Sequence, residues 1–183
     1  MCIMGAAQIQ TSIEYLKSKI RSIPDFPKPG VLYRDITPLL KDKKAFSICI
    51  DGMLEMISDK KIDYIAGIES RGFIIGAVLA ERRNVGFVPI RKKGKLPYTK
   101  TQVSYKLEYG EETIEMHNDA IEKGSRVLIV DDLLATGGTS SAAARLVESL
   151  GGKVSGFAFI VELKDLAGRE KLSKYDVRSL LVL

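Results

Sequence analysis

The sequence lacks the features of several protein classes. It has two cysteines, Cys2 and Cys49, one histidine and no tryptophan. Two cysteines cannot build a disulfide-rich scaffold, and their scarcity suits a reducing compartment. No apolar run approaches the ~20 residues that a membrane span needs, and the first ten residues lack the basic start and apolar core of a signal peptide. We therefore expect a cytoplasmic protein that does not enter a membrane.

The composition is that of an ordinary globular domain. Hydrophobic residues make up 45% and charged residues 28% of the 183 residues, and this length suits a single domain over 1–183. The formal net charge of +5 attracts anions, of which nucleic acids and small phosphorylated substrates are both candidates. Basic residues cluster only at 91–95 and no zinc-finger spacing occurs, so nucleic acid is not an expected partner.

Hydrophobic periodicity predicts helices that alternate with strands. Helices are expected over 9–23, 43–57, 72–82 and 140–150. Strands are expected over 62–68, 85–90, 127–130 and 154–161, with a hairpin formed by 105–109 and 113–117. The proline-rich stretch 25–37 predicts an ordered loop or flap, and the polar stretch 94–104 a mobile loop. This alternation is typical of an α/β fold with a central, mainly parallel sheet flanked by helices, whose ligands bind beyond the carboxyl ends of the strands.

Two adjacent acids, Asp131 and Asp132, end the strand predicted over 127–130. A glycine-containing loop and the start of a helix follow, and together they offer successive backbone N–H groups and two hydroxyls, which suit a monophosphate. The residues of this loop are Ala135, Thr136, Gly137, Gly138 and Thr139. No lysine follows the second glycine, so the segment is not a P-loop, and it is not a dinucleotide fingerprint. The acids would repel a phosphate, so we expect them to face sugar hydroxyls or a hydrated Mg²⁺.

Two further clusters follow predicted strands. The segment Glu69-Ser70-Arg71-Gly72 comes after the strand over 62–68, and the basic run 91–95 comes after the strand over 85–90. Arginine and lysine at such positions can neutralise phosphate oxygens. Taken alone, the first segment is also typical of a solvated helix cap with a surface salt bridge, and the basic run of a solvated charged face. Glu108 alone is typical of an exposed charge in a hairpin.

The segment VLIVDDLLATGG, residues 127–138, resembles the 5-phosphoribosyl 1-pyrophosphate motif of the type I phosphoribosyltransferases. Five more segments resemble that family in the same order, namely PDFPKPGVLYRDITPLL, IDYIAGIESRGF, IRKKGKLP, YKLEYG and VELKDLAGREKL. The resemblance covers nearly the whole of 20–172, and LLATGGT is similar to the version in members that act on adenine. It implies the type I phosphoribosyltransferase fold, with a small hood mainly over 24–37 and a flexible lid loop over about 94–109.

The resemblance implies one reaction, in which adenine and 5-phosphoribosyl 1-pyrophosphate give AMP and pyrophosphate with Mg²⁺. This is purine salvage by a glycosyltransferase, and the family works as homodimers. By similarity, Ala135 to Thr139 hold the 5′-phosphate, and Asp131 and Asp132 face the ribose hydroxyls. There the two acids steady positive charge at the anomeric carbon. The metal is expected to be held mainly by substrate oxygens, with Asp131 and Asp132 acting through water.

Other roles are also implied by the resemblance alone. Glu108 matches the catalytic glutamate, which shuttles the surplus proton of the purine. The residues expected to bind pyrophosphate are Glu69, Ser70, Arg71, Arg91, Lys95 and Tyr109. A cis peptide is expected between Glu69 and Ser70, and Arg91 is expected to reach across a dimer interface. Independently of the resemblance, Lys92 and Lys93 are expected to be solvated, because runs of charged residues usually form solvated faces.

The hood residues are expected to read the base. By similarity, the carbonyl of Leu32 accepts from the 6-amino group of adenine and the N–H of Arg34 donates to N1. Tyr33 and Leu133 sandwich the ring. Hypoxanthine inverts both polar contacts, which predicts strong selectivity for adenine.

Two alternatives stay open. A regulator of the same fold would sense phosphoribosyl pyrophosphate without catalysis, but such regulators usually add a DNA-binding domain, and one predicted helix before Ile23 is too little for a helix-turn-helix. Transfer to another base, such as hypoxanthine, xanthine or orotate, is the other alternative. The segments VLYRD and LLATGGT favour adenine.

Overall fold

The computed structural model describes residues 6–106 and 110–183. The chain forms two compact units, residues 1–52 and 53–183. The expected hood, 24–37, lies in the first unit, and the expected lid, 94–109, lies in the second. The assignment of the whole chain to a single domain remains a prediction.

The first unit contains a two-stranded hairpin among helices. Its elements are α1 (Ala6–Ser18), β1 (Arg21–Ile23), β2 (Tyr33–Asp35), α2 (Thr37–Lys41) and most of α3 (Lys43–Met56). The helix predicted over 9–23 is wrong at its end, because Lys19 and Ile20 close a turn and β1 pairs antiparallel with β2. Isoleucines at 20 and 23 gave the helical spacing, but β-branched residues also favour a strand. The stretch 25–37 is likewise not all loop, since it contains β2.

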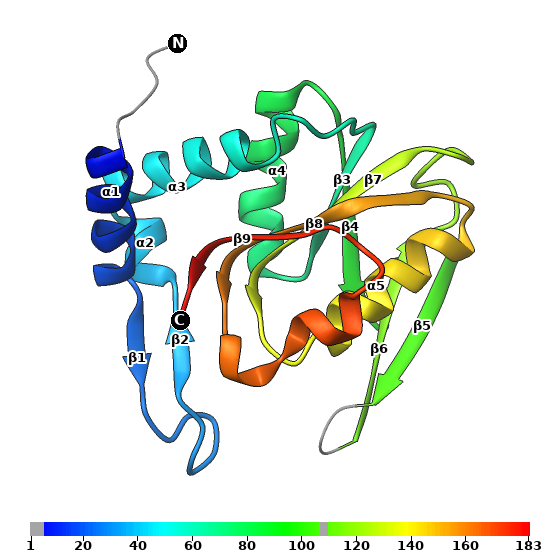
Figure 1. Ribbon diagram of the computed structural model, residues 1–183. Coiled ribbons are helices and arrows are strands. Elements are labelled where there is room, and N and C mark those ends of the chain that lie inside the picture. The colour runs from blue at the N-terminus through cyan, green and yellow to red at the C-terminus, as the bar shows by residue number, and fades with distance from the viewer. Residues whose placement is uncertain (1–5, 107–109) are drawn as a thin grey trace. The chain divides into compact units, whose positions relative to one another are not determined.

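The second unit is a seven-stranded sheet with helices. Its strands are β3 (Tyr64–Ile68), β4 (Gly86–Lys92), β5 (Lys100–Lys106), β6 (Glu111–His117), β7 (Arg126–Leu134), β8 (Lys153–Glu162) and β9 (Val177–Val182). Their order in the sheet is β5-β6-β4-β3-β7-β8-β9. The five strands β3, β4, β7, β8 and β9 run parallel, and the β5–β6 hairpin joins antiparallel at one end (Figure 1). The mainly parallel sheet confirms the predicted fold class.

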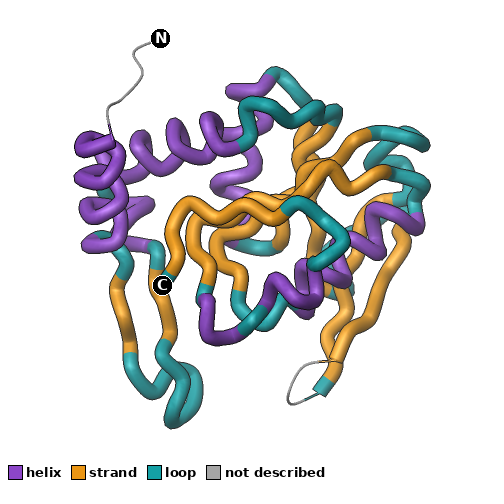
Figure 2. Tube along the Cα trace, in the orientation of Figure 1, coloured by secondary structure: helices purple, strands orange, loops and turns teal. Residues whose placement is uncertain are grey.

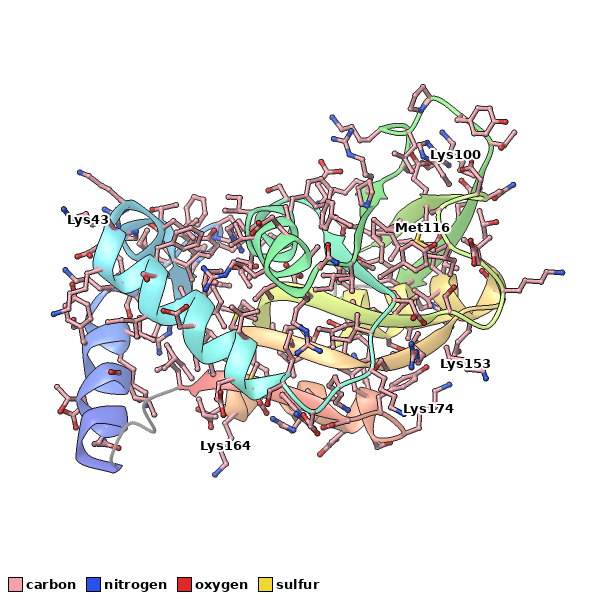
Figure 3. All side chains as sticks on the ribbon, turned by 90° about the horizontal axis from the view of Figure 1, so that it is seen from above. Lys43, Lys100, Met116, Lys153, Lys164 and Lys174 are labelled. Atoms are coloured by element: carbon pink, nitrogen blue, oxygen red, sulfur yellow. The ribbon has the colours of Figure 1, made fainter. Side chains whose placement is uncertain are left out.

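Helices α4 (Arg71–Arg83) and α5 (Gly138–Ser149) pack against the sheet of the second unit; Figure 2 draws helices in purple and strands in orange. Alternate residues of a strand point to opposite faces, so Ala66 and Ile129 face a core that includes Leu146 of α5. Ile65 points the other way, toward Gly76 of α4. Burial of these apolar side chains is the main force that holds the layers together. Met116, labelled in Figure 3, is fully buried in the core on the α5 face.

The observed boundaries of β5, of the β5–β6 hairpin and of β7 differ from the predicted ones. The stretch 94–104 is not a loop throughout, because Lys100–Lys106 forms β5 and pairs along its whole length with β6. The predicted hairpin therefore begins earlier than residue 105. The strand predicted over 127–130 continues to Leu134, so Asp131 and Asp132 lie within β7 and not beyond it. Two 3-10 turns, Lys164–Leu166 and Gly168–Leu172, connect β8 to the edge strand β9.

Candidate active site

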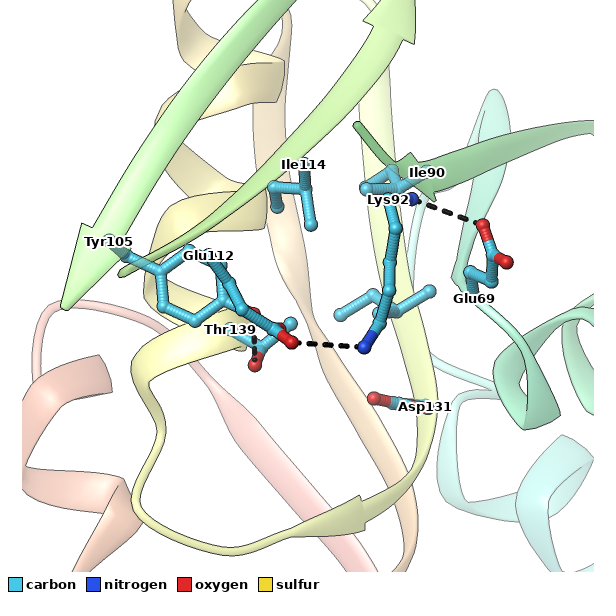
Figure 4. A pocket seen from close by; sticks show the side chains of 9 residues that line it. Glu69, Ile90, Lys92, Tyr105, Glu112, Ile114, Asp131 and Thr139 are labelled. Carbon is cyan, nitrogen blue, oxygen red and sulfur yellow. Dashed lines mark hydrogen bonds and ion pairs between the residues drawn. The ribbon is translucent and has the colours of Figure 1, made fainter. Parts of the chain in front are cut away.

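A cavity of about 180 Å³ lies where the parallel strands β3, β4 and β7 end. Its lining comes from these strands, from the β5–β6 hairpin and from the first turn of α5 (Figure 4). The lining residues are Ile68, Glu69, Ile90, Lys92, Tyr105, Glu112, Ile114, Asp131 and Thr139. Three of these, Glu69, Asp131 and Thr139, are predicted site residues, and the cavity brings them together from distant parts of the chain.

The glycine-containing loop joins β7 to α5 at this edge. Gly137 precedes the helix with φ at +74°, a backbone conformation that residues with a side chain rarely adopt. A Cβ at this position would lie 2.5 Å from the backbone oxygen of Gly168. The helix then begins at Gly138, and its first N–H groups have no partner within the helix. The loop therefore has a backbone path, and a helix N-terminus without a side-chain cap, that suit a phosphate site.

The two adjacent acids occupy different environments because they alternate along β7. Asp131 is half-buried and lines the cavity, and its Oδ1 accepts a hydrogen bond from the Asp132 N–H at 2.9 Å. Burial raises the pKa of Asp131 well above its ordinary value, and the negative charge of Asp132 adds to the rise. Asp132 is buried and pairs with the Arg71 Nε at 2.6 Å. Asp131 is thus the acid that faces the cavity, and Asp132 holds an arginine.

Close packing brings the start of α4 against these acids. A Cβ on Gly72 would lie 2.7 Å from the backbone oxygen of Val130 and 3.1 Å from Asp131 Oδ1. Only glycine lets the loop 69–72 approach β7 so closely. The approach explains how Arg71, which begins α4, reaches Asp132 in the neighbouring strand.

Glu69 holds the end of β4. Its Oε2 accepts hydrogen bonds from the Lys92 N–H at 3.0 Å and from the Arg91 Nε at 3.1 Å. Burial raises the pKa of Glu69, but these two donors outweigh it and keep the pKa below its ordinary value. The peptide bond between Glu69 and Ser70 is cis, which confirms the expectation from the resemblance. In this structure the Glu69 carboxylate contacts two basic residues of β4.

Arg91 lies in β4 and Lys95 shortly after it, but neither is among the described residues that line the cavity. The Arg91 Nη1 donates to the Lys95 carbonyl at 3.1 Å. The N–H groups of Lys95 and Leu96 donate to Oε1 of the buried Glu115 at 2.9 and 2.8 Å. These bonds fix the backbone of the basic turn that carries both residues.

Sequence reasoning missed the three other polar residues of the cavity, Lys92, Tyr105 and Glu112. Lys92, expected to be solvated, places its Nζ 3.0 Å from Glu112 Oε1. The Tyr105 hydroxyl donates to Glu112 Oε2 at 2.8 Å and accepts from the Thr139 hydroxyl at 2.9 Å (Figure 4). Burial, with the nearby Glu112, raises the pKa of Tyr105 to about 12. Tyr105 and Glu112 are direct cross-strand partners, so correct hairpin boundaries would have revealed this pair.

The other predicted site residues are placed less completely. Glu108 and Tyr109 lie outside the described residues. Leu32, Tyr33 and Arg34 belong to the first unit, whereas Leu133 lies on β7 in the second. Within the first unit the Tyr33 ring packs edge-on against Phe26 with centroids 5.2 Å apart, and Leu32 is 48% exposed. The predicted base contacts thus remain a hypothesis.

Comparisons with known proteins place this site in a family. Residues 38–182 match the family described as phosphoribosyl transferase domain. The chain belongs to this family. It is 58% identical over 166 residues to the adenine phosphoribosyltransferase of Brachyspira hyodysenteriae, which covers 91% of this chain and 98% of the relative. The adenine phosphoribosyltransferase of Halothermothrix orenii is 57% identical with the same coverage.

Solved structures of the family agree with the fold. The crystal structure of adenine phosphoribosyltransferase from Thermoanaerobacter pseudethanolicus matches with a TM-score of 0.92 at 53% identity, covering 93% of this chain and 99% of that one. The Saccharomyces cerevisiae enzyme, solved with an imino-altritol bisphosphate and adenine, matches with a TM-score of 0.88 at 41% identity, covering 94% and 99%. Family membership confirms the type I phosphoribosyltransferase fold and the prediction that the chain is a transferase. None of the described helices is long and apolar enough to cross a membrane.

Proposed function

We propose that the protein transfers the phosphoribosyl group of 5-phosphoribosyl 1-pyrophosphate to adenine, giving AMP and pyrophosphate in purine salvage. The observation that carries the proposal is the meeting of Asp131, Thr139 and Glu69 at one cavity, in a chain whose relatives are adenine phosphoribosyltransferases. The cavity lies at the carboxyl ends of parallel strands, where α/β enzymes bind their ligands.

The 5′-phosphate binds the loop that begins α5. Ala135, Thr136, Gly137, Gly138 and Thr139 supply backbone N–H groups and hydroxyls, and the helix N-terminus adds partial positive charge. The Thr139 hydroxyl already lies at the cavity wall, where it donates to Tyr105. This anchors the ribose with its anomeric carbon toward β7.

Asp131 and Asp132 act on the ribose side. Departure of pyrophosphate leaves positive charge on the anomeric carbon and ring oxygen, and a carboxylate nearby stabilises it. Burial makes Asp131 costly to ionise, so a cation placed beside it favours its charged form strongly. Asp132 acts chiefly by holding Arg71.

Pyrophosphate is bound by the loop 69–71 and the basic turn after β4. Arg71, Arg91 and Lys95 supply positive charge, Ser70 supplies backbone and hydroxyl donors, and Glu69 holds Arg91 in place. The planar guanidinium groups of the two arginines match the geometry of phosphate oxygens. Tyr109 contributes a hydroxyl, and Glu108 moves the purine proton.

Adenine is bound by Leu32, Tyr33, Arg34 and Leu133. The exposed side chain of Leu32 and the aromatic pair of Tyr33 and Phe26 supply apolar surface for a flat ring. The Leu32 carbonyl and the Arg34 N–H are complementary to the hydrogen-bonding groups on the edge of adenine. Hypoxanthine has the opposite donor and acceptor at these positions.

The residues at the cavity fit Mg²⁺ that arrives with the substrate. Glu69, Glu112 and Asp131 line the cavity against a single lysine, Lys92, and hard carboxylate oxygens suit this ion. Within the described residues no group of three or more acidic, histidine or cysteine side chains is arranged to hold a metal. Substrate oxygens would therefore be the main ligands, with Asp131 and Asp132 acting through water. When bound, the ion neutralises charge on the pyrophosphate.

We further propose that the enzyme works in the cytoplasm as a homodimer.

A product assay tests the proposal. The full chain is mixed with phosphoribosyl pyrophosphate, Mg²⁺ and either adenine or hypoxanthine, and the nucleotide is followed by chromatography. We expect AMP from adenine and at most traces of inosine monophosphate from hypoxanthine. Equal products would overturn the base assignment. Tight binding of phosphoribosyl pyrophosphate without product from either base would favour a sensor instead.

A further inference from the structure

Lys92 and Glu112 form an ion pair inside the cavity. Lys92 is the last residue of β4, and its ammonium lies 3.0 Å from Glu112 of β6 (Figure 4). The lysine side chain is 56% exposed and the glutamate 35%, so the pair faces the space that a ligand would enter. Among the described residues that line the cavity, Lys92 is the only lysine or arginine.

The Glu112 carboxylate is fixed on its other side. Its Oε2 accepts the Tyr105 hydroxyl at 2.8 Å, and Tyr105 in turn accepts from Thr139 at 2.9 Å. Tyr105 and Glu112 sit opposite each other in the antiparallel register. These contacts hold the negative charge at the cavity wall even when Lys92 moves.

We propose that Glu112 weakens the binding of phosphate-bearing ligands at this site by occupying Lys92 and by remaining beside it as a negative charge. The identity of the anion, pyrophosphate or a pyrophosphate ester, rests on the proposed function. An anion that binds the Lys92 ammonium must displace Glu112 or share the ammonium with it, and in either case it meets a like charge nearby. Glu112 is a positioning residue in this scheme, since it acts mainly by holding Lys92, and its own charge adds a smaller repulsion that does not need the lysine.

The consequence for the reaction is faster release. Phosphoribosyl pyrophosphate and pyrophosphate carry the same diphosphate group, so a residue that lowers affinity for one lowers affinity for the other. Since product release limits the turnover of many enzymes, a carboxylate that loosens pyrophosphate raises kcat while it also raises KM. Removing it should lower both.

The neighbouring glutamates of β6 have different surroundings. Glu115 is fully buried on the opposite face of the strand and accepts the N–H groups of Lys95 and Leu96, which is a structural role. Glu111 is exposed and also points away from Glu112, because strand residues alternate. Glu111 is therefore a matched control for loss of one negative charge.

Titration calorimetry with Mg²⁺ and pyrophosphate on the full chain tests the proposal. Glu112→Gln keeps the size of the side chain and an acceptor for Tyr105, so we expect pyrophosphate to bind roughly 3- to 10-fold more tightly. Glu111→Gln should change the affinity less than two-fold. In a Lys92→Met background the gain from Glu112→Gln should shrink to about two-fold or less. Structural damage would weaken binding, so a gain in affinity distinguishes the proposed role from a fold effect.

Three results would overturn the proposal: unchanged or weaker binding in Glu112→Gln, an equal gain in Glu111→Gln, or a full gain that survives in Lys92→Met. Steady-state kinetics adds a second readout, in which kcat and KM for phosphoribosyl pyrophosphate should fall together in Glu112→Gln. If the unaltered protein binds pyrophosphate but makes no AMP, the proposed function fails, while the affinity comparison still decides the role of Glu112.

Discussion

Acids lie near both ends of the paired strands β3 and β7, with Asp63 just before β3 and with Asp131 and Asp132 near the end of β7. Before β3, at the amino ends, Asp63 accepts the Arg126 N–H at 2.7 Å and its guanidinium at 2.9 and 2.5 Å. These bonds lower the pKa of Asp63 to about 2. Toward the carboxyl ends, burial raises the pKa of Asp131, which has another acid as its neighbour. The same residue type is thus stabilised in its charged form at one end and destabilised at the other.

The difference separates a structural from a functional use of charge. A paired carboxylate such as Asp63 adds to folding stability as soon as it is ionised, whereas ionisation of the half-buried, desolvated Asp131 works against it. Acids kept in an unfavourable environment gather at sites of chemistry. The comparison predicts that changes at the two ends separate activity from stability.

The largest effect should come from Asp131→Asn. Loss of the carboxylate that faces the cavity should lower kcat by about 100-fold or more, the scale reported for removing one group that stabilises a transition-state charge. Because folding raises the pKa of Asp131, its ionised form costs stability at pH values above that pKa, and the variant should melt no lower than the parent at neutral pH. Kinetics and thermal melting of one preparation check both points. Full activity would remove Asp131 from its role.

Gly137→Ala should have the next largest effect. A methyl group there meets the Gly168 backbone oxygen and must adopt a positive φ, so the loop has to move. We expect KM for phosphoribosyl pyrophosphate to rise about 10-fold and stability to fall by about 1–3 kcal/mol. Gly124→Ala is the control, since Gly124 has φ at +82° but open space around it. Equal effects on KM in the two variants would contradict the assignment of the loop.

Tyr105→Phe should have a smaller effect at the same end of the sheet. It removes the hydroxyl that joins Thr139 to Glu112, and a hydrogen bond of this kind contributes about 0.5–1.5 kcal/mol. We expect a rise of about 2- to 10-fold in KM for phosphoribosyl pyrophosphate, with little change in KM for adenine. Tyr98→Phe, at a residue that is 61% exposed, is the matched control. A change confined to adenine would place Tyr105 elsewhere in the reaction.

Asp63→Asn should leave turnover unchanged and affect stability alone. The lowered pKa means that the contribution of Asp63 is fully present above its ordinary value of 3.8 and is lost as pH falls through about 2. The melting temperatures of the variant and the parent should therefore differ slightly at pH 7 and converge near pH 2. A loss of activity at neutral pH would show that the two ends of the sheet are not independent.

Much of the second unit could be predicted from the sequence because buried parallel strands are continuous apolar runs. The predicted boundaries are wrong where a strand contains polar residues. Lys100–Lys106 alternates polar residues with Val103 and Tyr105, and its many polar residues led to the prediction of a loop. Asp131 and Asp132 similarly suggested that β7 had ended, although the strand continues through them to Leu134.

The polar contacts of the site were harder to predict. The motif placed Asp131 and Thr139 at the cavity because their positions follow from a single strand–loop–helix segment. Lys92 and Glu112 are 20 residues apart, and only the register between β4, β6 and β5 brings them together. A run of basic residues is usually solvated, so nothing local marked Lys92 as different from Lys93. The pairing between strands, and not the residue type, determines that Lys92 rather than Lys93 lines the cavity.

The most direct test of the contrast between the two ends is a ¹³C NMR titration of the aspartate carboxyl groups in the full chain. Spectra of Asp131→Asn and Asp63→Asn assign the two signals. The account predicts that Asp131 takes up its proton well above 3.8, while Asp63 stays ionised down to about pH 2. Titration of Asp131 at or below 3.8, or of both acids over the same range, would contradict it.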